Sequence, residues 1–397
     1  MSKDSEAGIV TARSPRWLVV AATLTNAAFV LSVQLIGLVA LAPADFGLFS
    51  LQYLVFALAS SVCLSVICEP WLRTDIHDAE RSPWRDYSSI LLYLSFAAGV
   101  AAVALSIVLP GLPVTAIPAA IAVAASVYRA GARYHQVRSL EWTRALISDV
   151  TGLVVTFGLW AVLFAVNVHG LLGLTIAWAV GACASAAISR PPVLQRPSSI
   201  STWIAAHRRH IWPLLKDSTL MDLGSIGTPF VVAPLLGIAD FGVYRAVSNV
   251  AAPVRLVLNP IRPTLAGIPL MTHRSRSHVL GSAAASIGFG VAAYLALIVV
   301  GALHINLGSL SAVVTYAVPT AIFVSANFIG HYYYIIARTH MHGSSLLTGR
   351  IIQTAVAVVL PIAGALAYAL PGAIWSYAIA TCISSLTWAI LVTRSRR

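Results

Sequence analysis

Residues 17–47 read WLVVAATLTNAAFVLSVQLIGLVALAPADFG. The stretch up to Ala42 contains no Asp, Glu, Lys or Arg, and it is long enough to cross a bilayer core of about 30 Å as a helix. Lipid offers no partner for backbone N–H and C=O groups, so a spanning segment is a helix or part of a closed barrel. This run far exceeds the roughly ten-residue alternating strand of a barrel. No small-residue cleavage site precedes it, so we expect a first transmembrane helix and not a cleaved signal.

The same pattern recurs along the chain. Of the 397 residues, 58% are hydrophobic and 10% are charged, and the mean hydropathy is +0.85; a soluble domain carries about 25% charged residues. The sequence therefore predicts an all-α integral membrane protein with twelve transmembrane helices. The predicted spans are 17–42, 48–71, 88–109, 114–135, 146–166, 171–189, 213–238, 243–270, 279–303, 311–337, 351–370 and 372–393.

Basic residues lie on one side of this layout. Of the 25 Lys and Arg, all but Arg245, Arg255 and Arg262 flank alternate junctions between spans, and these three lie inside span eight. Cytoplasmic loops are enriched in Lys and Arg, so both termini are expected in the cytoplasm. The predicted parts are a cytoplasmic tail 1–16, a six-helix bundle 17–190, a cytoplasmic linker 191–212, a second six-helix bundle 213–393 and a cytoplasmic tail 394–397.

A short repeat supports this division into two halves. Ala44-Asp45-Phe46-Gly47 follows span one, and the same four residues recur as Ala239-Asp240-Phe241-Gly242 after span seven. Arg144 at the start of span five likewise has a counterpart in Arg350 at the start of span eleven. Two six-helix bundles related by an internal repeat are typical of secondary transporters. We expect Asp45 and Asp240 to cap free backbone N–H groups at helix starts.

Three stretches resemble the multidrug/oligosaccharidyl-lipid/polysaccharide (MOP) exporter superfamily, especially the Wzx-like polysaccharide and O-antigen flippases. They are Leu41-Ala-Pro-Ala-Asp-Phe-Gly-Leu-Phe-Ser-Leu51, Arg129-Ala-Gly-Ala-Arg133-Tyr-His-Gln-Val-Arg138 and the second Ala-Asp-Phe-Gly-Val-Tyr. The resemblance implies a V-shaped pair of six-helix bundles that carries a lipid-linked oligosaccharide, or another amphiphile, across the membrane by alternating access.

Span eight contains the most prominent candidate site. On a helix, one arc of about 100° holds five polar or cationic side chains, which would not face lipid; they are Arg245, Ser248, Arg255, Asn259 and Arg262. They are expected to line a central cavity and bind phosphate oxygens, for which the Arg fork is suited. The alternative is that Arg245 and Arg262 reach to the two interfaces and only Arg255 is buried.

Other polar residues fall in spans one and seven. Asn26 and Gln34 share one face of span one, where they contact substrate or form interhelical hydrogen bonds. Asp217 and Asp222 lie in span seven. A buried Asp222 would pair with a span-eight arginine or bind a coupling proton or sodium ion, and an interfacial Asp222 would be solvated.

These features favour a flippase for a polyprenyl-pyrophosphate-linked oligosaccharide in a bacterial plasma membrane. The alternatives are a MOP-type drug or small-molecule antiporter coupled to H⁺ or Na⁺, and an integral-membrane polysaccharide polymerase or ligase. The predicted outer loops are too short to carry the catalytic groups of such an enzyme. We therefore expect no enzymatic activity, no cofactor and no metal site. The net charge of +12 is spread between spans, which argues against a nucleic-acid partner. Substrate lipid and membrane lipids are the expected partners, and the oligomeric state stays open.

Overall fold

The computed structural model describes residues 15–73 and 84–394, and the described part contains helices and no strands. The predicted tail 1–16 lies outside the described residues except for its last two positions, as does the tail 394–397 except for Arg394. Ten helices in the described ranges are long and apolar enough to cross a membrane. This confirms the all-α class and a multi-pass membrane protein.

The first half of the chain forms six spans. They are α1 (Arg16–Ala40), α2 (Pro43–Cys63) continued by a π-helical turn η1 (Leu64–Cys68) and α3 (Glu69–Arg73), α5 (Trp84–Val108), η2 (Pro113–Thr115) with α6 (Ala116–Arg138), α7 (Trp142–Ala165) and α8 (Gly170–Ile188). Helix α7 packs between α1 and α8, and α6 contacts both α5 and α8.

The second half repeats this arrangement with more interruptions. It comprises α9 (Ser198–Asp222), the π-helical turn η3 (Leu223–Gly227), α10 (Thr228–Leu236), α11 (Ile238–Val250), α12 (Ala252–Gly267), α13 (Leu270–His273), α14 (Arg276–Ala302), α15 (Gly308–Val313), η4 (Val314–Tyr316), α16 (Ala317–His340) and α17 (Gly343–Arg394). Helix α17 contains a break with non-helical backbone at Tyr368 and Ala369. Its two parts therefore account for two predicted spans, and α11 with α12 accounts for span eight.

Span eight differs from the single straight helix that we expected. Helix α11 ends at Val250, Ala251 has non-helical dihedral angles, and α12 restarts with Pro253 in its first turn. Proline has no N–H to continue the preceding helix but suits the first turn of a new one. The break therefore follows from Pro253.

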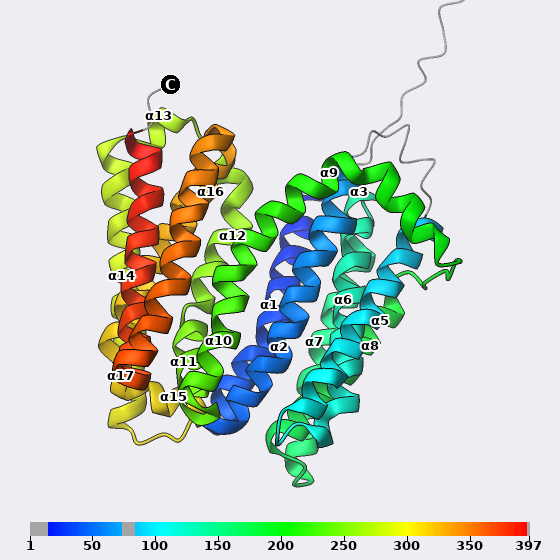
Figure 1. Ribbon diagram of the computed structural model, residues 1–397, viewed down its shortest axis with the longest axis horizontal. Coiled ribbons are helices and arrows are strands. Elements are labelled where there is room, and N and C mark those ends of the chain that lie inside the picture. Colours follow the sequence, from blue (N-terminus) through cyan, green and yellow to red (C-terminus); the bar gives the residue numbers. More distant parts are fainter. Residues whose placement is uncertain (1–14, 74–83, 395–397) are drawn as a thin grey trace, which may run out of the picture.

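The segment between the two bundles is not a simple loop. Helix α9 begins at Ser198, inside the predicted linker, and arches over one end of the first bundle (Figure 1). Its Trp203 and Ile211 are buried, whereas Arg208 and Arg209 are exposed, so the helix is amphipathic.

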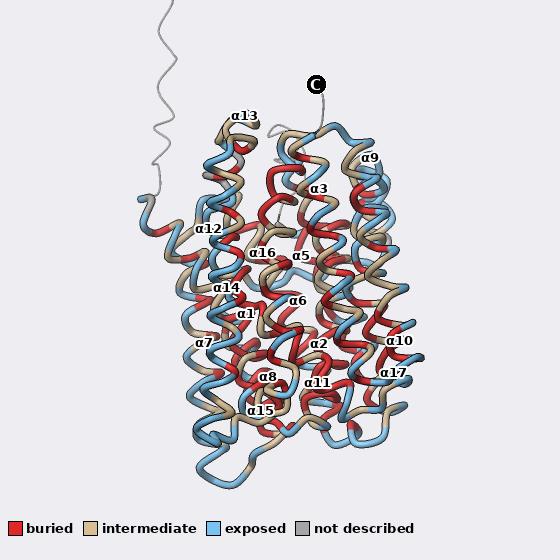
Figure 2. The backbone as a smooth tube through the Cα atoms, turned by 90° about the vertical axis from the view of Figure 1, so that its left-hand side faces the viewer, coloured by how far each residue is buried: buried red, intermediate tan, exposed pale blue. Residues whose placement is uncertain are grey.

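The two bundles meet at the end of the molecule where α1 turns into α2 (Figure 1). There α2 packs on α11 and α1 contacts α15, while α1 also contacts α12. In Figure 2 buried positions lie along the middle of the molecule and exposed ones along α7 and α17. Exposed apolar residues on these outer helices, such as Phe164 and Leu386, are suited to contact lipid.

Candidate functional site

A cavity of about 630 Å³ lies between the two bundles, with walls from α1, α2, η1, α6, α9, η3, α10, α11, α12, α16 and α17. Its polar lining residues are Asn26, Gln34, Tyr53, Ser60, Ser61, Arg129, Arg133, Tyr134, Asp222, Ser225, Tyr244, Arg245, Ser248, Asn249, Arg255, Asn327, His331 and Tyr377. Four of these are arginines and one is a carboxylate. The cavity wall is therefore cationic.

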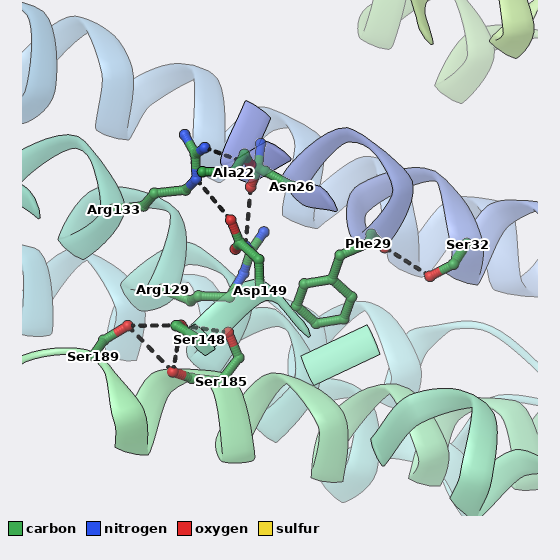
Figure 3. Close-up of polar contacts among 10 residues, drawn as sticks. All are labelled: Ala22, Asn26, Phe29, Ser32, Arg129, Arg133, Ser148, Asp149, Ser185 and Ser189. Carbon is green, nitrogen blue, oxygen red and sulfur yellow. Dashed lines mark hydrogen bonds and ion pairs between the residues drawn. The ribbon is translucent and has the colours of Figure 1, made fainter. Parts of the chain in front are cut away.

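The first-bundle wall is built around a carboxylate on α7 that the sequence analysis did not single out (Figure 3). Asp149 Oδ1 accepts a hydrogen bond from Arg129 Nη1 at 2.6 Å, and its Oδ2 accepts one from Arg133 Nε at 2.9 Å. Asp149 is 1% exposed and Arg129 is 3% exposed. One buried carboxylate thus holds two guanidinium groups, and the three groups together carry one net positive charge.

Helix α1 completes this cluster. Arg129 Nη1 also donates to Asn26 Oδ1 at 3.1 Å, and Arg133 Nη2 donates to the Ala22 carbonyl oxygen at 2.9 Å. The Arg129 guanidinium lies 4.5 Å from the centre of the Phe29 ring. The three helices α1, α6 and α7 therefore fix both arginines at the cavity wall.

Two signals in the sequence point to this cluster. Arg129 and Arg133 lie four residues apart inside an apolar segment, so they share one helix face. Both lie within predicted span four and in the second half of α6, near the junction with span five, and they pack against other helices. Asp149 is the single acidic residue of predicted span five, and a charge inside a span indicates a function or a partner.

The predicted stripe of span eight is only partly present. Arg245, Ser248 and Arg255 line the cavity, whereas Arg262 is exposed and not among the lining residues. The side chain of Asn259 lies outside the described residues. Arg262 lies on the same helix as Arg255, α12, but seven residues further on, which is about 10 Å along the helix axis and beyond the cavity.

The burial of Arg245 and Arg255 differs from the alternative in which only Arg255 is buried. Arg255 is exposed to the cavity, and Arg245 is the more enclosed. Arg245 Nε is buried and has no hydrogen-bond partner in the described part of the chain. The Ser248 hydroxyl is satisfied by its own helix, since it donates to the Arg245 carbonyl oxygen at 2.7 Å.

The two acidic residues of span seven have different surroundings. Asp222 is 7% exposed, lines the cavity just before η3 and has the Ser61 hydroxyl as a hydrogen-bonding neighbour. Within residues 15–73 and 84–394 no ion pair joins it to an arginine of α11 or α12, so the first of the three alternatives for Asp222 is not seen in this structure. The reason is rotational, because Asp222 faces α2.

Asp217 instead pairs with a residue of the second bundle. Its side chain is 55% exposed, and its Oδ1 lies 3.6 Å from Nε of the buried Arg350 on α17. Arg350 also donates to Tyr334 Oη at 2.6 Å and to Gln353 Oε1 at 3.2 Å. Asp217 does not line the cavity, and its position indicates a structural ion pair.

The polar face of span one is at the cavity as expected. Asn26 and the buried Gln34 both line it, and Asn26 also bonds to Arg129 across helices. The position of Asn26 is therefore compatible with both of its expected roles.

Asp45 and Asp240 lie in the first turns of α2 and α11, but neither makes a capping hydrogen bond. A negative charge in the first turn still stabilises the helix, because it interacts favourably with the positive end of the helix dipole.

No family model matches the sequence, and no curated protein matches it. Solved structures match over nearly the whole chain. One, described as the inward-facing conformation of a multidrug resistance MATE family transporter of the MOP superfamily, has a TM-score of 0.63 at 11% identity, with 96% of this chain and 100% of that chain covered. The lipid II flippase MurJ in an inward closed conformation has a TM-score of 0.57 at 13% identity, with 95% and 87% covered. The eukaryotic MATE transporter AtDTX14 has a TM-score of 0.55 at 14% identity, with 96% and 95% covered. At these identities the similarity concerns the fold, and the chain has the fold that these membrane transporters share.

Proposed function

We propose that this chain is a MOP-type flippase that moves a polyprenyl-pyrophosphate-linked oligosaccharide across the bacterial plasma membrane by alternating access, for polysaccharide biosynthesis. The observation that carries the proposal is the charge of the central cavity. Four arginines line it, and the carboxylates of Asp149 and Asp222 offset only two of these charges. The remaining positive charge suits a ligand with an anionic head group.

The arginines also have donors to spare. Nε of Arg245 is buried without a partner, and no hydrogen bond or ion pair reaches the Arg255 guanidinium in the described ranges. A buried donor without a partner costs about 1–3 kcal/mol, which a phosphate oxygen would offset. Guanidinium groups bind phosphate through two parallel hydrogen bonds. The volume of about 630 Å³ fits a head group, and the polyprenyl chain would extend into lipid.

Asp222 supports coupling of transport to an ion gradient. It is buried at the cavity wall, and Ser60 in the same wall has a buried hydroxyl without a partner in the described part of the molecule. A buried carboxylate that no arginine contacts directly is stabilised by a proton or a cation. We propose that Asp222 binds H⁺ or Na⁺.

A cation-coupled drug antiporter is the second candidate, and Asp222 and the fold similarity to MATE transporters favour it. A cationic drug would meet four arginines in the cavity and only one lining carboxylate. The arrangement therefore supports an anionic substrate better.

The test is flux in proteoliposomes that contain lipid-linked oligosaccharide. Arg255→Ala should lose nearly all flux, because a lost charge-assisted contact of about 1.5–3 kcal/mol weakens binding about ten- to a hundredfold. Arg255→Lys should keep the charge and lose much of the flux, since an ammonium cannot form the paired hydrogen bonds.

Arg276→Ala is the matched control, because Arg276 begins α14 and does not line the cavity. Equal amounts of inserted protein are compared. Wild-type flux from Arg255→Ala would refute the role of Arg255. Transport of a cationic dye such as ethidium, with no movement of lipid-linked oligosaccharide, would favour the antiporter.

A further inference from the structure

The two copies of the Ala-Asp-Phe-Gly repeat meet in space. They occupy the same positions in the first turns of α2 and α11, which pack against each other. Phe46 and Phe241 are both fully buried. The stacked pair Phe46–Phe49, at 6.2 Å between ring centres, corresponds to Phe241–Tyr244 at 6.4 Å. The repeat is thus a structural repeat around one helix contact.

Glycines 47 and 242 make this contact reciprocal. A Cβ atom on Gly47 would lie 3.2 Å from Gly242 N and would overlap the Ile238 carbonyl oxygen. A Cβ atom on Gly242 would lie 3.1 Å from Gly47 N and would overlap the Pro43 carbonyl oxygen. Ile238 occupies in α11 the position that Pro43 has in α2, so the contact has internal two-fold symmetry. We call these two turns, 43–47 and 238–242, the glycine seam.

The glycine seam closes one end of the central cavity. Tyr53 and Tyr244 lie further along the same two helices and line the cavity. The seam lies at the end of the molecule opposite the C-terminus (Figure 1). Within the described residues, no hydrogen bond or ion pair joins α2 to α11.

The opposite end is held differently. There Ser65 Oγ donates to Ser218 Oγ at 2.8 Å, and Arg338 of α16 lies 3.7 Å from Glu69 at the start of α3. These polar contacts link the first bundle to α9 and α16. At the seam end the Ser309 hydroxyl of α15 donates to the Leu41 carbonyl oxygen at 2.8 Å, so that end combines close backbone packing with a side-chain-to-backbone hydrogen bond, whereas the opposite end is linked by pairs of polar side chains.

We propose that the glycine seam is the gate of the cavity on the side opposite the chain ends, and that the repeated glycines exist to let this gate shut. Helices α2 and α11 touch through their glycines, and within the described residues no hydrogen bond or ion pair between these two helices has to break when they separate. The Ser309 hydroxyl and the Leu41 carbonyl oxygen, which are bonded beside the seam, would exchange their hydrogen bond for water. This inference rests on alternating access in the proposed function. It is tested by access to the cavity and not by flux, so failure of one does not imply failure of the other.

The experiment measures labelling of a cavity cysteine. Ala57→Cys, which lines the cavity, is introduced after the four native cysteines are replaced by serine or alanine. An impermeant maleimide is added from the seam side of uniformly oriented proteoliposomes. Gly47→Ala and Gly242→Ala should each raise the labelling rate about five- to thirtyfold, the population change that a shift of 1–2 kcal/mol causes. Labelling from the opposite side should fall or stay constant.

Gly158→Ala and Gly288→Ala are matched controls, because a Cβ atom at either position meets nothing within 4 Å. Unchanged labelling from the seam side in both seam variants, at equal abundance and melting temperature, would overturn the proposal. If the seam variants do not insert into the membrane, a second measurement keeps both glycines. Spin labels are attached at the exposed positions Ala44→Cys and Ala239→Cys, and the distance between the two labels reports whether the seam is closed or open. Two distance populations are expected, and one narrow population with and without sodium and at low pH would overturn the gate.

Discussion

At the level of single residues, Asp149 holds two arginines of the cavity wall in place. It is buried, and its two oxygens accept from different side chains of α6. A buried ion pair contributes little net stability because desolvation offsets attraction, but removing one partner leaves an uncompensated charge. The structural consequence of losing Asp149 should therefore be large.

We predict that Asp149→Asn destabilises the protein by about 3–5 kcal/mol, because Arg129 and Arg133 are then left without a carboxylate. The measurement is the melting temperature of the purified protein in detergent, together with its abundance in the membrane. Asp240→Asn is the control, since Asp240 is exposed and surface substitutions usually change stability by less than about 0.5 kcal/mol. Equal melting temperatures for the two variants would contradict this account.

Asp222 should behave differently, because among the described residues no arginine lies within ion-pair distance of it and Arg350 attracts it only from further away. We predict that Asp222→Asn keeps its abundance but slows transport and flattens the dependence of flux on the sodium or proton gradient. Flux in proteoliposomes with imposed gradients is the measurement. Loss of abundance with normal flux per molecule would instead show a structural role.

At the level of elements, the π-helical turns and the break in span eight shape the cavity. Turns η1 and η3 lie on helices that contact each other; Ser61 lies three residues before η1, and Asp222 directly precedes η3. A π-helical turn inserts one residue into a helix and is frequent at functional sites. The turn η3 that follows Asp222 packs against α17.

The short helix α13 lies between α12 and α14 and ends at His273, whose side chain is fully buried. His273 Nε2 donates to the Leu265 carbonyl oxygen at 3.0 Å, so Nδ1 of the neutral ring accepts from Tyr332 Oη at 3.2 Å. Burial is the main cause that lowers the pKa of His273; the hydrogen bond to the Leu265 carbonyl oxygen offsets part of this, and the nearby His340 and His278 lower the pKa further. The neutral form is therefore the one that the fold stabilises.

A lowered pKa makes the stability depend on pH. The folded protein binds fewer protons than the unfolded chain, so this contribution is complete above the unfolded pKa of about 6.5 and is lost as the pH falls towards the lowered value. We predict that the melting temperature falls between about pH 7.5 and pH 5.5 by more in the wild type than in His273→Gln. The exposed His304, changed to Gln, should show the wild-type fall. An identical fall in His273→Gln would exclude this histidine as the cause.

At the level of the whole molecule, two bundles related by a repeat enclose one cavity. Their contact through the glycine seam and their polar contacts at the other end place the cavity between two closures. The distribution of Lys and Arg predicts which face of this arrangement lies in the cytoplasm.

We predict that a reporter active only in the cytoplasm is active when fused after Arg190 or Arg397 and inactive when fused after Gly111 or Pro371. The basic residues near Arg190 and at the chain end should remain inside, and the junctions at Gly111 and Pro371 contain no Lys or Arg. Enzymatic activity of each fusion, normalised to its abundance, is the measurement. Activity after Gly111 would contradict the twelve-span layout.

The sequence alone determined the helical class, the position of the twelve segments and the repeat, because burial in lipid, helix periodicity and proline or glycine turns act over a few residues at a time. Only the tertiary structure decided that Asp149 binds Arg129 and Arg133, that Asp222 faces α2, and that Gly47 meets Gly242. Each of these depends on which helices are neighbours and how each is rotated about its axis. Hydropathy carries little of that information, since a polar face can be satisfied by several different neighbours.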